Sequence, residues 1–98
     1  MEMNLVLGAW KEDEAGLHKT FQFQDFRHAL SFLVEVGRLA EQAGHHPDVD
    51  LRYNKVSLTL LTHSAGRITE KDHSLAAEID RLPLERIAAG SRALFTAG

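Results

Sequence analysis

Residues 41–48, with the sequence Glu-Gln-Ala-Gly-His-His-Pro-Asp, form the stretch around which the rest of the chain is arranged. Gly44 suits the left-handed backbone conformation that ends many helices. Pro47 cannot continue a helix, and it biases His46 towards an extended conformation. The stretch therefore predicts a stiff corner at a helix exit, from which His45 and His46 point in different directions. Imidazoles suit proton transfer near neutral pH, although a turn that merely contains two histidines is the alternative interpretation.

The segment before this corner predicts a long amphipathic helix. Asp25 is a suitable N-cap, and Gly44 provides the stop. Apolar residues recur between them at spacings of three and four: Phe26, Leu30, Leu33, Gly37 and Ala40, with Ala29, Val36 and Ala43 widening the stripe. Glu41 falls in the last turn, where the helix dipole disfavours a negative charge by about 0.3–1 kcal/mol. We therefore expect Glu41 to have another purpose, such as orienting a histidine.

Alternating apolar and polar residues predict an antiparallel hairpin on each side of this helix. The first spans about Trp10 to Phe23, and Lys19 is the one polar residue on its apolar face. The second contains residues 49–53 and 56–62. If its last strand runs regularly, His63 lies on the polar face with Ser57 and Thr59, where a solvated histidine is the simpler interpretation.

A second helix is expected after the loop of residues 64–67. Thr69 is a good N-cap, and Asp72 follows three residues later, as in a capping box with aspartate for glutamate. The apolar stripe of this helix is Leu75, Ala76, Ile79 and Leu82. Asp72 thus has a complete structural explanation, and any functional role would be additional. Residues 84–95 predict a marginal third helix, because Gly90 interrupts it at a cost of about 1 kcal/mol.

Composition limits the class of protein. A chain of 98 residues is enough for one domain, and it buries only about 60–65% of its unfolded surface, so self-association is expected. The net charge of −3 argues against nucleic acid or an anionic membrane as the main partner. The absence of cysteine excludes disulfides, thiolate chemistry and Cys-ligated zinc. Without a signal peptide or a long apolar run, a cytoplasmic protein is the default expectation.

These elements and motifs together resemble the pterin-4a-carbinolamine dehydratases, known in animals also as dimerisation cofactors of a homeodomain transcription factor. The family pattern is a charged residue, a His-His-Pro corner, an aromatic residue, a histidine and an aspartate at set spacings. Here it reads Glu41, His45-His46-Pro47, Tyr53, His63 and Asp72. The resemblance runs from about Trp10 to Leu82. It implies one dehydratase-like domain over residues 1–98, with a core of about 10–82 and a C-terminal tail of 83–98.

Two departures from the family pattern stand out. Members usually begin with a helix before a Gly-Trp strand, whereas nine residues precede Trp10 here, so that helix is expected to be absent or vestigial. The loop after His63 commonly carries Gly-Leu before its Thr or Ser cap, whereas this chain has Gly66-Arg67-Ile68. Arg67 is therefore expected near the site, where it could alter substrate preference.

The resemblance implies a fold, an assembly and an activity. The fold is a two-layer α+β structure, in which a four-stranded antiparallel sheet carries two main helices on one face in the order β-β-α-β-β-α, with a possible extra C-terminal helix. The assembly is a homodimer or homotetramer. The activity is dehydration of 4a-hydroxytetrahydropterin to quinonoid dihydropterin, which recycles the pterin after aromatic amino-acid hydroxylases have used it. The pterin is the substrate, and no metal or further cofactor is implied.

The resemblance also assigns roles to residues. His45 and His63 would be the proton-transfer pair, and His46 would mainly hold the pterin. Glu41 and Asp72 would orient imidazoles and bias their tautomers. The implied substrate-binding set is His45, His46, Pro47, Tyr53 and His63.

Two other classes of function remain open from the sequence. One is a non-catalytic interaction module, similar to a coactivator or an assembly factor, on the same fold. The other is a zinc site built from His45, His46 and His63, since three histidines can hold catalytic zinc. Adjacent histidines at a bend do not easily aim at one ion, which disfavours the zinc site.

Overall fold

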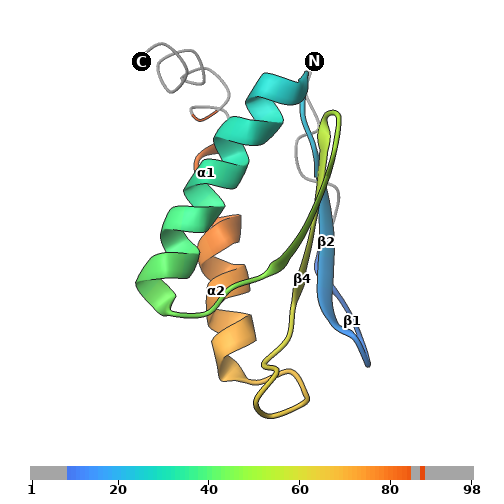
Figure 1. Ribbon diagram of the computed structural model, residues 1–98, viewed down its shortest axis with the longest axis vertical. Helices are drawn as coiled ribbons and strands as arrows, with labels where there is room; N and C mark the ends of the chain where they lie inside the picture. The colour runs from blue at the N-terminus through green and yellow to red at the C-terminus, as the bar shows by residue number, and fades with distance from the viewer. Residues whose placement is uncertain (1–8, 85–86, 88–98) are drawn as a thin grey trace.

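The computed structural model describes residues 9–84 and residue 87. Its elements follow the order β-β-α-β-β-α (Figure 1). They are β1 (Lys11–Asp13), β2 (Gly16–Gln22), α1 (Phe26–Ala43), β3 (Asp48–Arg52), β4 (Lys55–Leu60) and α2 (Glu70–Asp80). The α+β fold predicted from the sequence is therefore confirmed.

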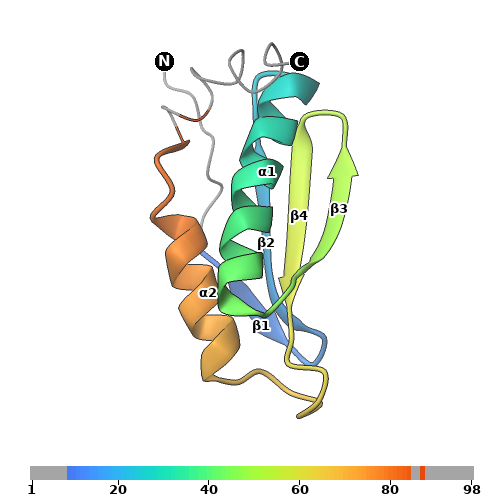
Figure 2. The same cartoon turned by 60° about the vertical axis from the view of Figure 1, so that its left-hand side comes forward.

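The four strands form one antiparallel sheet in the order β1-β2-β4-β3. Each predicted hairpin supplies an edge strand and a central strand, and β2 pairs with β4 in the middle. Both helices cover the same face of this sheet (Figure 2). As a result, the exit of α1, the start of α2 and the end of β4 come together at one end of the molecule.

The core lies between the sheet and the helices. Phe21 and Leu17 of β2 stand opposite Val56 and Leu60 of β4, so their side chains share the face that the helices cover. Phe32 of α1 packs against the first hairpin, with its ring centroid 4.7 Å from that of Phe21 and 5.0 Å from that of Phe23. The other large, fully buried apolar side chains are Val36, Leu58, Leu75 and Ile79.

The buried face of α1 overlaps the predicted stripe at Ala29, Val36 and Ala40, but it also contains Phe32 and Leu39, which the stripe left out. The residues that enter the core are Ala29, Phe32, Val36, Leu39 and Ala40. Phe26, expected in the core, is 46% exposed, and Gly37 also faces solvent. The helix is apolar on two adjoining sides, and the sheet takes the side with Phe32 because that large ring fills the space between Phe21 and Phe23.

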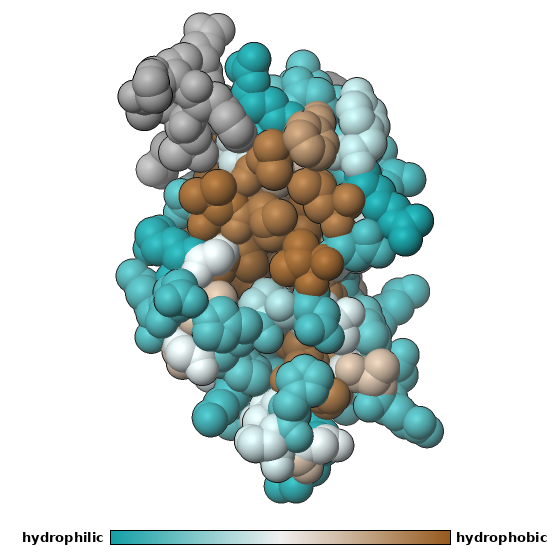
Figure 3. Space-filling view, in the orientation of Figure 1, coloured by the Kyte–Doolittle hydropathy of each residue, from teal (hydrophilic) through white to brown (hydrophobic). Residues whose placement is uncertain are grey.

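The other apolar side of α1 stays uncovered in the single chain. Phe26 and Val34 of α1 and Val49 of edge strand β3 are large apolar side chains that are 46–53% exposed. Figure 3 shows a hydrophobic patch over the middle of α1, extending towards the sheet. A patch of this kind on a small domain usually marks an interaction surface.

Lys19, the polar residue on the apolar face of β2, is buried for a specific reason. Its Nζ lies 2.8 Å from Asp80 Oδ1 near the end of α2, and Trp10 Nε1 donates to the same carboxylate at 3.1 Å. The ammonium also lies 5.0 Å from the centroid of the Phe21 ring. The buried ammonium is thus paired with a half-exposed carboxylate, and the pair joins β2 to the C-terminal end of α2.

Gly16 allows the start of β2 to approach the end of β4 closely. A Cβ built at this position would lie 2.3 Å from the carbonyl oxygen of Leu60, and the φ of Gly16 is +132°. Only glycine allows this close approach of two backbones.

Strand β4 ends at Leu60, earlier than its alternation predicted. Thr62 then forms an isolated antiparallel bridge with Arg67, and residues 63–66 make a turn. The alternation along β4 therefore does not decide which face of the sheet His63 takes, because the regular strand has ended before it. The predicted third helix and the family's N-terminal helix fall almost entirely outside the described residues, although Leu84 and Ile87 pack against the core.

Candidate active site

The site begins at the exit of α1, where the chain turns as the sequence predicted. Gly44 adopts the left-handed conformation, with φ +63° and ψ +32°. The N–H of His45 donates to the carbonyl of Ala40 at 3.1 Å, which completes the cap. The backbone of His45 is thereby fixed to the end of the helix before the chain enters β3.

His45 reaches across to the second helix and contacts Asp72. The distance between His45 Nε2 and Asp72 Oδ1 is 2.6 Å. The Asp72 side chain is fully buried, and that of His45 is 12% exposed. A hydrogen bond between these groups in so little water is strong and fixes the orientation of the ring.

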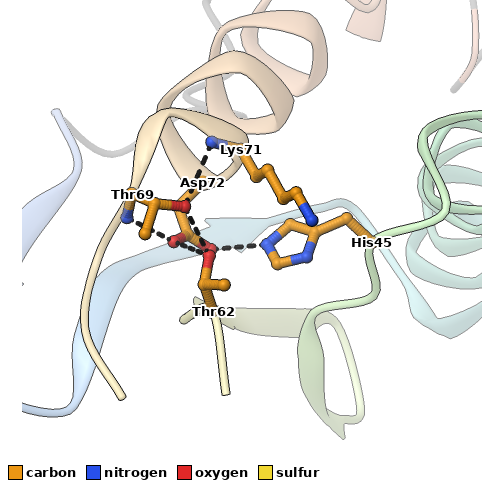
Figure 4. Close-up of polar contacts among 5 residues, drawn as sticks. All are labelled: His45, Thr62, Thr69, Lys71 and Asp72. Atoms are coloured by element: carbon orange, nitrogen blue, oxygen red, sulfur yellow. Dashed lines mark hydrogen bonds and ion pairs between the residues drawn. The ribbon is translucent and has the colours of Figure 1, made fainter. Parts of the chain in front are cut away.

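Asp72 is held by the start of α2 and by the end of β4 (Figure 4). Its Oδ2 accepts from the Thr69 backbone N–H at 2.9 Å and from the Thr62 hydroxyl at 2.7 Å. The predicted capping box is present, with Thr69 as the N-cap. Burial by itself would raise the pKa of Asp72, but the hydrogen bonds from His45, Thr69 and Thr62 outweigh it and hold the pKa below its usual range. Asp72 is therefore a carboxylate that orients His45 as well as a helix cap.

His46 points elsewhere, as expected for adjacent residues at a corner. Its Nε2 lies 2.7 Å from Glu41 Oε2, and both side chains are well exposed, at 62% and 78%. An exposed pair of this kind contributes little to stability. Glu41 thus contacts His46, whereas the more deeply placed His45 contacts Asp72.

The three histidines border one open hollow of about 300 Å³. Its lining residues are Gly44, His45, His46, Leu61, Thr62, His63, Ser64 and Lys71. A second hollow of about 240 Å³ lies between the end of α1 and the start of α2, and His45 and Lys71 border both. The arrangement offers three groups that can give or take protons around a space at the lower limit for a small-molecule site.

The family model described as pterin 4 alpha carbinolamine dehydratase matches residues 1–82 of this chain. The chain belongs to this family. The match covers both hairpins, both helices and every residue of the motif from Glu41 to Asp72.

Relatives and solved structures agree with this assignment. A protein of Roseiflexus sp. (strain RS-1), named "Putative pterin-4-alpha-carbinolamine dehydratase", is 49% identical over 76 residues, which cover 78% of this chain and 82% of the relative. A protein of the same name from Acidobacterium capsulatum is 49% identical over 78% of this chain and 83% of its own length.

Two solved structures share the fold. The transcriptional coactivator/pterin dehydratase of Brucella melitensis has a TM-score of 0.70 at 32% identity, over 84% of each chain. A pterin dehydratase-like protein identified as a RuBisCO assembly factor in the α-carboxysome has a TM-score of 0.64 at 25% identity, over 83% of this chain and 90% of that one. The fold of the pterin-4a-carbinolamine dehydratase family therefore occurs both in a protein described as a dehydratase and in one described as an assembly factor.

The structure does not bring every motif residue to the hollow. Tyr53 lies in the β3–β4 turn with φ +52° and is 66% exposed. The five residues of β3 separate it from the histidine corner, which at about 3.3 Å per residue is roughly 17 Å. Arg67 is exposed, and only its backbone is seen to contact the site region, through Thr62. Within one chain, Tyr53 therefore does not contact a ligand held by the three histidines.

The described residues give no support to a zinc site. Among residues 9–84 and 87, no group of three or more His, Cys, Asp or Glu side chains is placed to hold a metal ion. His45 and His46 each direct Nε2 to a different carboxylate. No helix in this part of the chain is long and apolar enough to cross a membrane.

Sequence reasoning missed two residues of the site, Thr62 and Lys71. Thr62 resembled one more position of an alternating strand, and only its place beside Asp72 shows its role. Lys71 adjoins Asp72 in the sequence, and its side chain extends towards the His45 ring in Figure 4. A lysine in the first turn of a helix opposes the dipole, and this was the one sequence signal that could have singled it out.

Proposed function

We propose that this protein dehydrates 4a-hydroxytetrahydropterin to quinonoid dihydropterin by histidine general acid–base catalysis. The observation that carries the proposal is the His45–Asp72 pair, which stands at the border of a hollow that His46 and His63 also line. Family membership supports the same reaction.

The chemistry requires two proton transfers and no redox step. The C4a–O bond breaks, and the hydroxyl leaves as water after it takes a proton from an acid. A proton on a ring nitrogen passes to a base, and the electron pair of the N–H bond forms the new double bond. Histidines can supply both groups near pH 7, and a well-placed proton transfer typically contributes about 10²–10⁴-fold to the rate.

The residues divide these roles by their surroundings. His45 is the base, because the buried Asp72 carboxylate orients its ring and stabilises the imidazolium that forms. His63, which also lines the hollow, is the acid that protonates the leaving hydroxyl. His46, paired with Glu41, holds the pterin ring, and Pro47 keeps that corner stiff. The reaction uses the pterin as substrate and takes place in the cytoplasm, where it would follow an aromatic amino-acid hydroxylase.

A direct assay tests the proposal. An aromatic amino-acid hydroxylase generates the 4a-carbinolamine, and its loss is followed by absorbance with and without this protein. We expect the purified protein to accelerate the loss and the His45→Ala variant to lose most of that acceleration. No acceleration by the folded wild-type protein would overturn the proposal.

A binding role is the second candidate, and the exposed apolar patch favours it. Phe26, Val34 and Val49 present a surface that a second copy of the chain or a partner protein could cover. Of the two similar structures, one is a protein described as a coactivator and the other is a protein described as an assembly factor. The patch does not include the three histidines, so one molecule can carry out catalysis and self-association as a homodimer or homotetramer.

A further inference from the structure

The Thr62 hydroxyl occupies a central position among the polar groups that support His45. Thr62 is 6% exposed, and its Oγ1 lies 2.7 Å from Asp72 Oδ2 and 2.6 Å from Thr69 Oγ1. It follows β4 and immediately precedes His63. Thr62 therefore stands between the carboxylate that orients His45 and the backbone that carries His63.

The direction of each hydrogen bond follows from counting protons. An ionised Asp72 can only accept, so the Thr62 hydroxyl must donate to it. The single Thr62 proton is then used, and the contact with Thr69 requires the Thr69 hydroxyl to donate to Thr62 Oγ1. Thr69 Oγ1 in turn accepts from the Lys71 backbone N–H at 3.3 Å. If the Thr62 proton pointed to Thr69 instead, two acceptor oxygens would face each other at 2.7 Å.

The hydrogen bonds to Asp72 determine which ring nitrogen of His45 carries a proton. Thr62 and Thr69 fill Asp72 Oδ2, which leaves Oδ1 as the oxygen that meets His45 Nε2. Because that oxygen carries no proton, His45 Nε2 must carry one. In the neutral ring Nδ1 is then the nitrogen that can accept a proton from a ligand.

The backbone of Thr62 is itself well fixed. Its N–H donates to the carbonyl of Arg67 at 3.2 Å, and its carbonyl accepts from the N–H groups of Ala65 and Gly66 at 3.0 and 2.8 Å. A β-branched side chain on such a backbone has few rotamers. The hydroxyl is thus held in place before any ligand arrives.

We propose that Thr62 is a positioning residue, whose hydroxyl keeps Asp72 ionised and in one rotamer and so holds His45 in the tautomer with the proton on Nε2. The proposal rests on the proposed function for its kinetic meaning, but the tautomer itself can be measured without activity. Among the described residues, His45 is the titratable side chain in contact with Asp72, and because it meets Oδ1 it does not replace the lost Thr62 proton at Oδ2.

The first test uses NMR on the wild-type protein and on two variants. In the wild type, the Thr62 hydroxyl proton should be protected from exchange and correlate with the Asp72 carboxyl carbon. The His45 ring should show one tautomer, with a pyrrole-like Nε2. Thr62→Val removes the hydroxyl at nearly constant shape, so Asp72 should titrate at higher pH and the His45 nitrogens should show a mixture of tautomers. Thr62→Ser keeps the hydroxyl and should retain the wild-type spectrum.

The second test measures kinetics on the same proteins. Thr62→Val should lower kcat about ten-fold with little change in KM, whereas Thr62→Ser should stay within about two-fold of the wild type. Thr20→Val is the matched control, because Thr20 makes a hydroxyl contact with Ser57 on the sheet face away from the helices. It should leave both the His45 spectrum and the turnover unchanged.

The outcomes separate the two proposals. An inactive wild-type protein with the expected spectra overturns the proposed function and leaves the positioning role of Thr62 supported. A Thr62 proton that correlates with Thr69 instead of Asp72 overturns the positioning role, and that result needs no variant to fold. So does a Thr62→Val protein with an unchanged Asp72 titration and a single His45 tautomer.

Discussion

His45 Nε2 lies 2.6 Å from Asp72 Oδ1, although 27 positions separate the two residues in the chain. One residue closes the exit of α1, and the other caps the start of α2. The same contact therefore joins the two helices and orients the group that we propose as the base.

His45 and His63 should behave as one catalytic unit. Each single alanine substitution should lower kcat by about 10²-fold, and the double substitution should cost far less than the product of the two. His46→Ala should instead raise KM more than it lowers kcat, because it removes binding shared by the ground and transition states. Steady-state kinetics of the four variants measure these effects. Fully multiplicative losses at His45 and His63 would contradict a shared mechanism.

Asp72 should contribute stability that acid removes. The folded state lowers the pKa of Asp72, so its stabilisation is present above the unfolded value of about 3.8 and is lost as the pH falls through the folded value. The unfolding free energy of the wild type should fall as the pH drops below about 3.8. Asp72→Asn should cost about 1–2 kcal/mol at pH 7 and show a shallower fall.

Part of the acid dependence should survive in the Asp72→Asn variant. Contacts with His18 and His28 also lower the pKa values of Asp13 and Asp25, which remain in that variant. Urea unfolding at several pH values provides the measurement. Parallel curves for the wild type and the variant would show that Asp72 is not linked to acid unfolding.

The Lys19–Asp80 pair should respond asymmetrically to mutation. Asp80→Ala leaves the Lys19 ammonium, whose side chain is 5% exposed, without its partner, and we expect a loss of about 2–4 kcal/mol. Lys19→Met should cost less than about 1 kcal/mol, because Asp80 is 40% exposed and keeps its contact with Trp10. Chemical denaturation compares the two. Equal losses would mean that the pair contributes mainly through its attraction and not through the cost of an unpaired buried charge.

Gly37 within α1 and Gly44 at its C-cap should respond in opposite directions to alanine substitution. Gly44 has a φ of +63°, so Gly44→Ala should destabilise the protein by about 1–2 kcal/mol and disturb the histidine corner. Gly37 lies within the helix with nothing within 4 Å of a built Cβ, so Gly37→Ala should stabilise it by about 0.5–1 kcal/mol. Thermal unfolding and the dehydratase assay together report both effects. A stabilising Gly44→Ala would be inconsistent with the left-handed cap.

The apolar patch on α1 should control self-association. Val34 is 53% exposed, and Val34→Glu places a charge in the patch without opening a cavity in the core. We expect its mass in solution to fall below that of the wild type, as measured by sedimentation or light scattering. Gln42→Glu adds the same charge at another exposed position of α1 and should leave the mass unchanged. An identical mass for Val34→Glu and the wild type would assign self-association to another surface.

The local elements could be predicted because their signals are local. Asp25 and Gly44 bound α1 where capping chemistry places them, and Thr69 with Asp72 begins α2. Alternation located both hairpins, because side chains on a strand point to opposite faces in turn. The motif from Glu41 to Asp72 indicated the family before any contact was known.

The tertiary structure alone decided which groups meet. The sequence of α1 has two apolar sides. The side that faces the sheet is the one with Phe32, whose ring packs against Phe21 and Phe23. Lys19 is a polar residue on the apolar face of β2, and only the folded chain shows that Asp80 of α2 pairs with it. Spacing could not tell which carboxylate serves which histidine, because Asp72 reaches His45 only when both helices cover the same face of the sheet. Thr62 had no signal of its own, since a hydroxyl's role depends on the donors and acceptors that folding places around it.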